Sequence, residues 1–201
     1  MEGTWIFYIS VCGAYLIGSI PFGIVASKLC GAIDPRSTGS GNIGFTNVLR
    51  VSGKKAGILT LIGDLGKGLF VGWLASRTLG EEVWILAVTF AVVAGHVFSV
   101  FLRFRGGKGV ATALGAVMGV DFTLGLLLLG VWLSVVAIFK YSSGGALAAF
   151  FLFPGISVAF AYSVSFIIFA CTLSSMIIFR HTDNILRLLS GQEGKIGSSS
   201  S

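Results

Sequence analysis

The chain has 201 residues, of which 55% are hydrophobic and 11% are charged, and its formal net charge at pH 7 is +6. A soluble domain carries roughly 25% charged residues, so this chain has too few charges to cover a water-facing surface. Composition therefore excludes a soluble globular protein and indicates one that sits in a lipid bilayer.

Apolar segments of spanning length follow one another along the chain. A helix needs about 20 apolar residues to cross roughly 30 Å of hydrocarbon. Residues 5–29, 56–75 and 83–102 each meet this requirement. The first of them has no basic start and is too long for a signal peptide. We therefore expect each of the three to span the membrane once.

Two longer apolar segments each predict two spans. Residues 110–139 carry one charge, Asp121, near their middle, and residues 144–179 contain Pro154-Gly155 near theirs. As single helices rising about 1.5 Å per residue they would be about 45 Å and 54 Å long, too long for one untilted crossing. Splitting both predicts an all-α polytopic membrane bundle of seven spans. Five spans, with both segments left whole, is the alternative.

Positive charge predicts the orientation, because Lys and Arg are enriched in cytoplasmic loops. In the seven-span scheme twelve of the 14 basic residues lie on one side, Arg77 lies on the other, and Lys67 falls inside a span. The N-terminus is then outside and the C-terminus is cytoplasmic. We expect one integral membrane domain over residues 1–193, followed by a polar tail over residues 194–201.

A few reactive or ionisable groups lie within the apolar segments. Cys12, Cys30 and Cys171 have neither metal-ligand nor paired spacing, so we expect buried thiols and no disulfide framework. Asp64 and Lys67 are three residues apart near mid-membrane, where ionisable groups are costly and are usually paired or functional. An ion pair that braces the bundle is the favoured interpretation, and a role in ligand binding is the alternative.

Polar residues gather in three main segments, residues 34–55, 103–112 and 180–193, with a small patch at residues 140–143. In the seven-span scheme all four fall on the cytoplasmic side. Segments that are distant along the chain can therefore converge on one site at the membrane surface, and we expect them to do so.

The first polar segment favours a phosphate site. Gly39, Gly41 and Gly44 allow positive φ angles and a close approach of backbone amides to an anion. Neutral donors and one planar cation accompany these glycines: Ser40, Thr46, Asn47 and Arg50. The guanidinium of arginine matches the geometry of phosphate. The alternative is a flexible connector with a helix cap at Thr46-Asn47.

The second segment places Lys108 between glycines, in Gly106-Gly107-Lys108-Gly109, with His96 about two helical turns before the basic cluster. The GxxxxGK[ST] spacing and preceding strand of a Walker A loop are missing. Anchoring at lipid head groups explains Arg103 and Arg105 well, but it does not require glycines around Lys108. Contact of Lys108 with a ligand phosphate therefore stays open beside it.

The third segment places polar groups on one helical face. On a helix, His181 and Asn184 are neighbours at a spacing of three, as are Asn184 and Arg187. An amphipathic interfacial helix would explain the leucines of this segment but not the grouping of a histidine, an asparagine and an arginine.

Several kinds of chemistry do not fit these segments. The acids Asp34, Asp183 and Glu193 are too dispersed for a magnesium cage, so we expect no metal. Neither histidine is followed by the acid of the HxxxxD acyltransferases, and no GxSxG elbow is present. What remains is a site that binds phosphorylated molecules and orients them for direct transfer.

The chain resembles the bacterial acyl-phosphate:glycerol-3-phosphate acyltransferases over nearly its whole length. The blocks that carry the resemblance are residues 15–23, 39–50, 64–68, 95–96, 104–112 and 180–187. Phe45 departs from the family pattern, which more often has a small residue there, and residues 140–143 match only loosely.

The resemblance implies seven spans in the bacterial inner membrane and a site facing the cytoplasm. It implies transfer of an acyl chain from acyl phosphate to the sn-1 hydroxyl of glycerol 3-phosphate, the first step of bacterial phospholipid synthesis, without a cofactor. Substrate and phosphate binding would fall to Ser40, Gly41, Asn42, Thr46, Asn47, Arg50, Lys108 and Ser143. Positioning of the glycerol hydroxyl and nearby oxygens would fall to His96, His181 and Asn184.

Direct attack without a covalent acyl-enzyme is expected, because an acyl phosphate is already activated and phosphate is a good leaving group. The expected partners are the two substrates and membrane lipids, with no nucleic acid and no obligate protein partner. A transporter of an organic phosphate is the competing function; Lys67 inside a span favours it, and the one-sided motifs oppose it. A non-catalytic lipid-surface scaffold would leave the glycine-rich loops unexplained.

Overall fold

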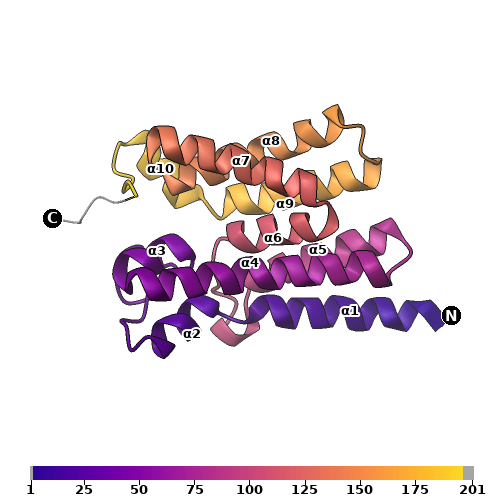
Figure 1. Ribbon diagram of the computed structural model, residues 1–201, viewed down its shortest axis with the longest axis horizontal. Helices are drawn as coiled ribbons and strands as arrows, with labels where there is room; N and C mark the ends of the chain where they lie inside the picture. Colours follow the sequence, from indigo (N-terminus) through magenta and orange to yellow (C-terminus); the bar gives the residue numbers. More distant parts are fainter. Residues whose placement is uncertain (1, 197–201) are drawn as a thin grey trace. The chain divides into compact units, whose positions relative to one another are not determined.

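The computed structural model describes residues 2–196, and the regular structure within that range is entirely helical (Figure 1). The predicted all-α class is therefore confirmed. Contacts divide the chain into two compact units, one up to Gly125 and the other from Leu126 onward. The expected single domain over residues 1–193 stays a prediction.

The first unit contains most of the helices: α1 (Glu2–Ser19), α2 (Phe22–Leu29), α3 (Phe45–Val51), α4 (Gly53–Thr78), α5 (Glu82–Val97), the 3-10 helix η1 (Val100–Leu102), α6 (Val110–Val120) and the start of α7 (Phe122–Phe139). The segment predicted as one span over residues 5–29 is bent by 41° between α1 and α2. The bend lies at Ile20-Pro21, where proline removes a backbone donor and disfavours helical geometry in the residue before it.

Helices α4 and α6 pack backbone to backbone through glycines. Gly68 and Gly72 of α4 are four residues apart, as are Gly115 and Gly119 of α6. A Cβ added at any of these four positions would overlap the backbone of the facing helix, at Thr112, Ala116, Leu65 and Leu69 respectively. Small residues at this spacing allow close helix packing in membranes, where helices gain little from burying apolar surface.

The second unit contains the rest of α7, then α8 (Ser142–Ala159), α9 (Val164–Phe179) and α10 (Thr182–Leu189). Aromatic side chains form the core between α8 and α9. Phe153 meets Phe150, Phe166 and Phe169 edge to face, with ring centroids 6.1–6.3 Å apart. Ile196 donates from its backbone N–H to the Lys140 carbonyl at 2.8 Å, so the described start of the expected tail is attached to this unit. Residues 197–201 lie outside the described range.

The first long apolar segment divides where the sequence predicts. Helix α6 ends at Val120, and the carboxylate of the next residue, Asp121, accepts a hydrogen bond from the backbone N–H of Leu124, in the first turn of α7, at 2.9 Å.

The second long segment also divides, but the predicted position at Pro154-Gly155 is wrong. Helix α8 runs through Pro154 to Ala159, and the chain turns over residues 160–163 instead, with Ala161 at φ 55°. Proline removes one helical hydrogen bond, whereas ending the helix there would leave many backbone groups unsatisfied in an apolar medium. The Ser163 hydroxyl then caps α9 by accepting from the Phe166 N–H.

Within the described residues, four helices or helix pairs are long and apolar enough to cross a membrane: α4, α5 with η1, α7 and α8. The number rises to six if the bent pairs α1–α2 and α9–α10 each count as one span. Helix α6 is apolar, but its 11 residues extend only about 17 Å. A seventh span would have to include α6, so seven spans and the orientation of the termini stay predictions.

The expectation that the three cysteines are buried is wrong. Cys12, Cys30 and Cys171 are all exposed on the protein surface. Large apolar side chains such as Trp5 and Phe151 are exposed as well. Such surfaces suit a membrane protein, in which lipid chains rather than other protein segments cover the outer faces of the helices.

Candidate functional site

Asn47 holds together the glycine-rich loop that joins α2 to α3. Its side chain is almost fully buried, and its amide nitrogen donates to the carbonyls of Pro35 and Asn42, both at 2.9 Å. Its amide oxygen accepts from the Ser40 N–H at 3.0 Å. Gly39, with φ +66°, lies against this amide, and a Cβ there would overlap its oxygen. The Asn47 side chain therefore joins three separate points of the loop backbone.

The other predicted residues of this loop and of α3 lie closer to the protein surface. Ser40, Gly41 and Arg50 are exposed, while Asn42 and Thr46 are half-buried. Gly41 has a positive φ of +67°. The Asn42 side-chain oxygen accepts from the N–H of Gly44, the residue before α3, at 2.8 Å. The loop thus presents the Ser40 hydroxyl and the Gly41 backbone at its surface, and Arg50 is exposed on α3, which follows the loop.

An exposed ion pair lies at the start of the same loop. Arg36 donates to the Asp34 carboxylate at 2.6 Å, and this hydrogen bond holds the pKa of Asp34 below its usual range. The negative charge of Asp34 is therefore compensated locally, which limits its repulsion of an anion bound near the loop.

A buried cluster of three ionisable side chains lies between α4 and α5. The Lys67 Nζ is 2.9 Å from Asp64 Oδ1 and 3.0 Å from His96 Nδ1, and the last two atoms are 3.3 Å apart. The side chains of Lys67 and Asp64 are 2% and 3% exposed. The predicted ion pair is confirmed, and His96, which the sequence placed in another segment, joins it.

The bend between α1 and α2 completes the surroundings of Lys67. Its Nζ donates to the carbonyl of Ile20 at 2.9 Å. It also lies 5.6 Å from the centre of the Phe22 ring, a geometry suited to a cation–π contact. Ile20 and Phe22 flank Pro21, so the break in the helix brings a backbone carbonyl and an aromatic ring to the buried cation.

His96 contacts the glycine-rich loop that carries Lys108. Its carbonyl accepts from the Gly107 N–H at 3.1 Å, and the neighbouring Val97 carbonyl accepts from the Gly106 N–H at 3.1 Å. A Cβ on Gly107 would overlap the Nε2 of His96. The two glycines therefore lie along the end of α5, and half-buried Lys108 follows directly after them.

In the second unit, the carboxylate of Glu193 gathers three side chains. It accepts from Ser143 Oγ at 2.5 Å, from Asn184 Nδ2 at 2.6 Å and from Arg187 Nε at 2.7 Å. Burial by itself would raise the pKa of Glu193, but these donors and the charge of Arg187 hold that pKa below its ordinary value. Ser143 and Asn184, predicted from different segments, thus meet on one acceptor.

The role of Glu193 is the main feature that sequence reasoning missed, because it treated this residue only as an isolated acid. A turn at Gly191, with φ +70°, folds Glu193 back onto α10. The sequence contained one signal for this turn, Gly191 between the polar helix and Glu193. A glycine at this position indicates a turn but does not indicate which side chains the acid contacts.

His181 lies directly before α10, is 3% exposed, and has its ring orientation set by the backbone. Its Nδ1 is 2.7 Å from the carbonyl oxygen of Ile177. Because a carbonyl can only accept, Nδ1 carries the hydrogen, and in the neutral ring Nε2 carries the lone pair.

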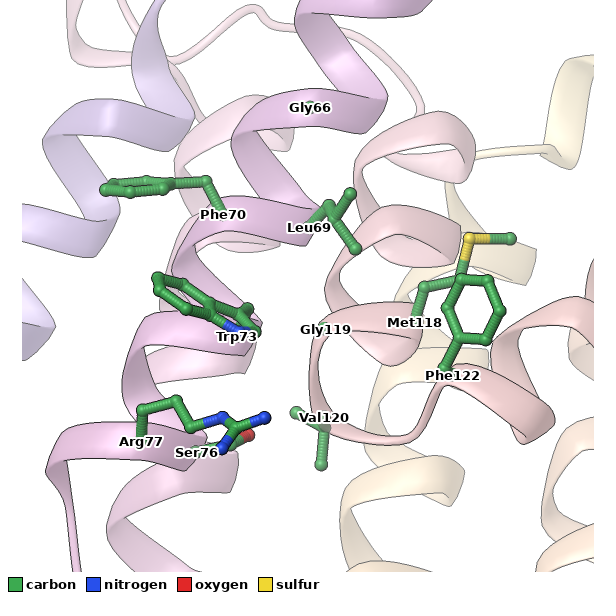
Figure 2. Close-up of a pocket in the computed structure, with 10 residues that line it drawn as sticks. All are labelled: Gly66, Leu69, Phe70, Trp73, Ser76, Arg77, Met118, Gly119, Val120 and Phe122. Carbon is green, nitrogen blue, oxygen red and sulfur yellow. The ribbon is translucent and has the colours of Figure 1, made fainter.

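A separate groove of about 730 Å³ lies along α4 in the first unit (Figure 2). Figure 2 shows Phe70 and Trp73 on α4, with Met118 and Phe122 on the opposite wall. The remaining lining residues are Gly66, Leu69, Ser76, Arg77, Gly119 and Val120. This mostly apolar groove contains none of the residues predicted to bind phosphate, so it is distinct from the polar loops described above.

The predicted site residues therefore form local groups within each unit. Ser40, Asn42 and Asn47 share the first loop, His96 lies against the Gly106–Gly109 loop, and Ser143 joins Asn184. Convergence of all the polar segments on one pocket involves both units and stays a prediction.

Comparison with known proteins gives consistent results over nearly the whole chain. The family model described as glycerol-3-phosphate acyltransferase matches residues 8–191. A glycerol-3-phosphate acyltransferase of Aromatoleum aromaticum is 44% identical over 195 residues, covering 97% of this chain and 99% of the relative. The protein of that name from Thioalkalivibrio sulfidiphilus is 49% identical over 189 residues, covering 94% of this chain and 93% of the relative.

The fold is also similar to that of solved structures. Crystal structures of PlsY (YgiH), an integral membrane glycerol 3-phosphate acyltransferase, match in two forms. The glycerol 3-phosphate form has a TM-score of 0.90 at 39% identity, covering 95% of this chain and 96% of that one. The lysophosphatidic acid form has a TM-score of 0.88 at 38% identity, covering 95% of each chain. Together with the apolar helices described above, these matches show an integral membrane protein that belongs to the glycerol-3-phosphate acyltransferase family.

Proposed function

We propose that this protein transfers a fatty acyl group from acyl phosphate to the sn-1 hydroxyl of glycerol 3-phosphate, at the cytoplasmic face of the bacterial inner membrane. The products are 1-acylglycerol 3-phosphate, which is lysophosphatidic acid, and phosphate. The observation that carries the proposal is the full-length similarity to PlsY, solved in forms named for glycerol 3-phosphate and lysophosphatidic acid. The first of these is an acceptor substrate, and the second is the product of its acylation.

The loops of the first unit suit the binding of phosphate groups. Arg50 is exposed beside a loop that presents Ser40 and Gly41, and Lys108 follows two glycines at the end of α5. Two phosphorylated substrates repel one another, and these two cations would offset that repulsion. Asn42 of the first loop and Thr46 at the start of α3 add polar groups, whereas Asn47 acts indirectly, because its amide holds the loop backbone.

The second unit suits activation of a hydroxyl group. The Nε2 lone pair of His181 can accept a hydrogen bond from the glycerol hydroxyl, and Asn184 is oriented by Glu193. The hydroxyl oxygen attacks the acyl carbonyl carbon, a new C–O ester bond forms, and the C–O bond to phosphate breaks. The hydroxyl proton leaves to the departing phosphate, directly or through His181. No side chain is acylated.

Purified protein in detergent tests this proposal. With palmitoyl phosphate and glycerol 3-phosphate, we expect phosphate release that requires both substrates. His181→Ala and Asn184→Ala should each reduce turnover at saturating substrate, by on the order of 100-fold or more where a proton acceptor is lost. Gln192→Ala serves as the control, because this residue is exposed and directly precedes Glu193 in the sequence. Full turnover by both variants would refute the assigned roles, and a trapped acyl-serine or acyl-cysteine would refute direct transfer.

Transport of an organic phosphate was favoured only by a lysine inside a span. The structure accounts for that lysine differently, because the Lys67 ammonium has three acceptors within 3.0 Å. Uptake of glycerol 3-phosphate into vesicles that contain the protein, without release of phosphate, would show that the protein is a transporter instead.

A further inference from the structure

We propose that Lys67 is a positioning residue that fixes the tautomer of His96. In this tautomer Nδ1 accepts a hydrogen bond from Lys67 and Nε2 carries the hydrogen. His96 is then a hydrogen-bond donor beside the Gly106–Gly109 loop and not a proton acceptor.

The contacts of the Lys67 ammonium determine which nitrogen of His96 carries the hydrogen. A lysine ammonium has three hydrogens and no lone pair. Three acceptor atoms lie within 3.0 Å of Nζ: the Ile20 oxygen at 2.9 Å, Asp64 Oδ1 at 2.9 Å and His96 Nδ1 at 3.0 Å. Nζ donates to the Ile20 oxygen and forms an ion pair with Asp64 Oδ1, which accepts no hydrogen bond of good geometry. Because the ammonium can only donate, the His96 Nδ1 at 3.0 Å must present its lone pair to Lys67. A neutral imidazole with a lone pair on Nδ1 carries its hydrogen on Nε2.

The surroundings favour a charged Lys67. Asp64 is almost fully buried and needs a nearby cation, and the Lys67 ammonium at 2.9 Å lies closer to its Oδ1 than His96 does at 3.3 Å. The ring of Phe22 adds a favourable face for a cation. In the competing arrangement, the Nδ1–H of His96 donates to Asp64 Oδ1 at 3.3 Å, which is longer than the 3.0 Å between His96 Nδ1 and Lys67 Nζ. Lys67 must then be neutral, because an ammonium N–H would otherwise face the N–H of His96.

The direction of Nε2 gives this tautomer a use. The Nε2 edge of His96 lies against Gly107, because a Cβ on that glycine would overlap it. An N–H on this edge adds a donor next to the loop of Lys108, where a lone pair would repel an anion. His181 has the opposite tautomer, with its hydrogen on Nδ1. This step rests on the proposed function, since it takes the anion at the loop to be a substrate phosphate.

Nitrogen NMR of the protein labelled with 15N-histidine tests the tautomer directly. The chain has two histidines, so the spectrum contains four ring nitrogens, and His96→Gln assigns them by loss of one pair. We expect a protonated Nε2 and an unprotonated Nδ1 for His96. A hydrogen on Nδ1, or on both nitrogens, would overturn the proposal. The spectrum does not depend on turnover, so failure of the proposed function would be a separate result.

A double variant, Asp64→Leu with Lys67→Met, tests the role of Lys67 without leaving a buried charge unpaired. We expect the His96 spectrum of this variant to show a mixture of the two tautomers in place of a single Nε2–H form. We also expect kcat/KM for glycerol 3-phosphate to decrease by up to about 100-fold, the scale of a misplaced binding group. The control is Lys55→Met, an exposed lysine on the same helix, which should change kcat/KM by less than about threefold. A folded double variant that keeps both the signal and kcat/KM would refute the proposal. If the double variant does not fold, the wild-type spectrum decides.

Discussion

Backbone carbonyls orient several of the polar side chains of this protein. Lys67 donates to Ile20, and His181 donates to Ile177. Asn47 likewise donates to carbonyls of the loop that it holds. Because a carbonyl oxygen only accepts, it determines which atom of the side chain faces it and leaves the other polar atoms to face elsewhere. At the scale of single residues, the site therefore depends on backbone groups that every residue type possesses.

Gly107→Ala should impair the reaction through His96. The new Cβ would overlap the Nε2 of His96, so either the ring or the loop of Lys108 must move. We expect kcat/KM for glycerol 3-phosphate to fall by roughly 10- to 100-fold. The control is Gly80→Ala, since a Cβ at Gly80 meets open space. Unchanged kinetics of the purified Gly107→Ala protein would contradict the contact.

Glu193 should make a stability contribution that acid removes. Its pKa is lower in the folded protein than its ordinary value of 4.5, so the folded state binds its proton less readily than the unfolded chain does. The contribution is then complete above pH 4.5 and is lost as the pH falls through the lower, folded-state pKa. Thermal unfolding of the wild type and Glu193→Gln in detergent should give a stability difference that is constant near neutral pH and shrinks in acid. A difference that persists at low pH would contradict this assignment.

At the scale of helices, the polar groups gather where the apolar helices end. The bend between α1 and α2 supplies the Ile20 carbonyl, and the end of α5 supplies the carbonyls that hold Gly106 and Gly107. The 61° bend between α9 and α10 places His181 at a helix start. Helix ends carry unsatisfied backbone groups and can bind polar partners, whereas a helix interior in lipid has none to spare.

The glycine contact between α4 and α6 should be required for stability. Gly72→Val would place a side chain on the backbone of Ala116, whereas Gly66 of the same helix faces open space. We expect Gly72→Val to lower the free energy of unfolding by about 1–3 kcal/mol relative to Gly66→Val, the range for overpacked sites. Thermal unfolding in detergent measures this difference, and equal stabilities of the two variants would show that the helices can separate without cost.

At the scale of the whole molecule, the proposed function requires polar segments of both units to face the same aqueous compartment. The first unit carries the phosphate-binding candidates, and the second carries His181, Asn184 and Ser143. Two substrates can react only if both sets of groups reach them together. The proposed function therefore depends on a topology in which residues 34–55, 103–112 and 180–193 are all cytoplasmic.

Cysteine labelling in intact cells tests this topology. In a background with Cys12, Cys30 and Cys171 replaced by alanine, single cysteines are introduced at the exposed positions Thr38, Ser190 and Gly80. A membrane-impermeant reagent should label Gly80→Cys in intact cells and the other two variants only after permeabilisation. Labelling of Thr38→Cys and Ser190→Cys from opposite sides would refute the shared site.

The sequence by itself determined that the protein is helical and belongs in a membrane, that Asp64 pairs with Lys67, and that a long apolar segment divides at Asp121. These features depend on composition, helical spacing or local chain chemistry, which are all readable within a few residues. Resemblance to a family also indicated which polar segments matter.

Only the tertiary structure decided where the chain turns after α8, which groups meet at Glu193, and that His96 joins the buried ion pair. Lys67 is 29 positions from His96 and 47 from Ile20. Contacts over such separations depend on how helices pack, and here they pack where glycines let two backbones approach. A hydrogen-bond partner, and with it the tautomer of a histidine, is therefore a property of the assembled helices and not of the local sequence.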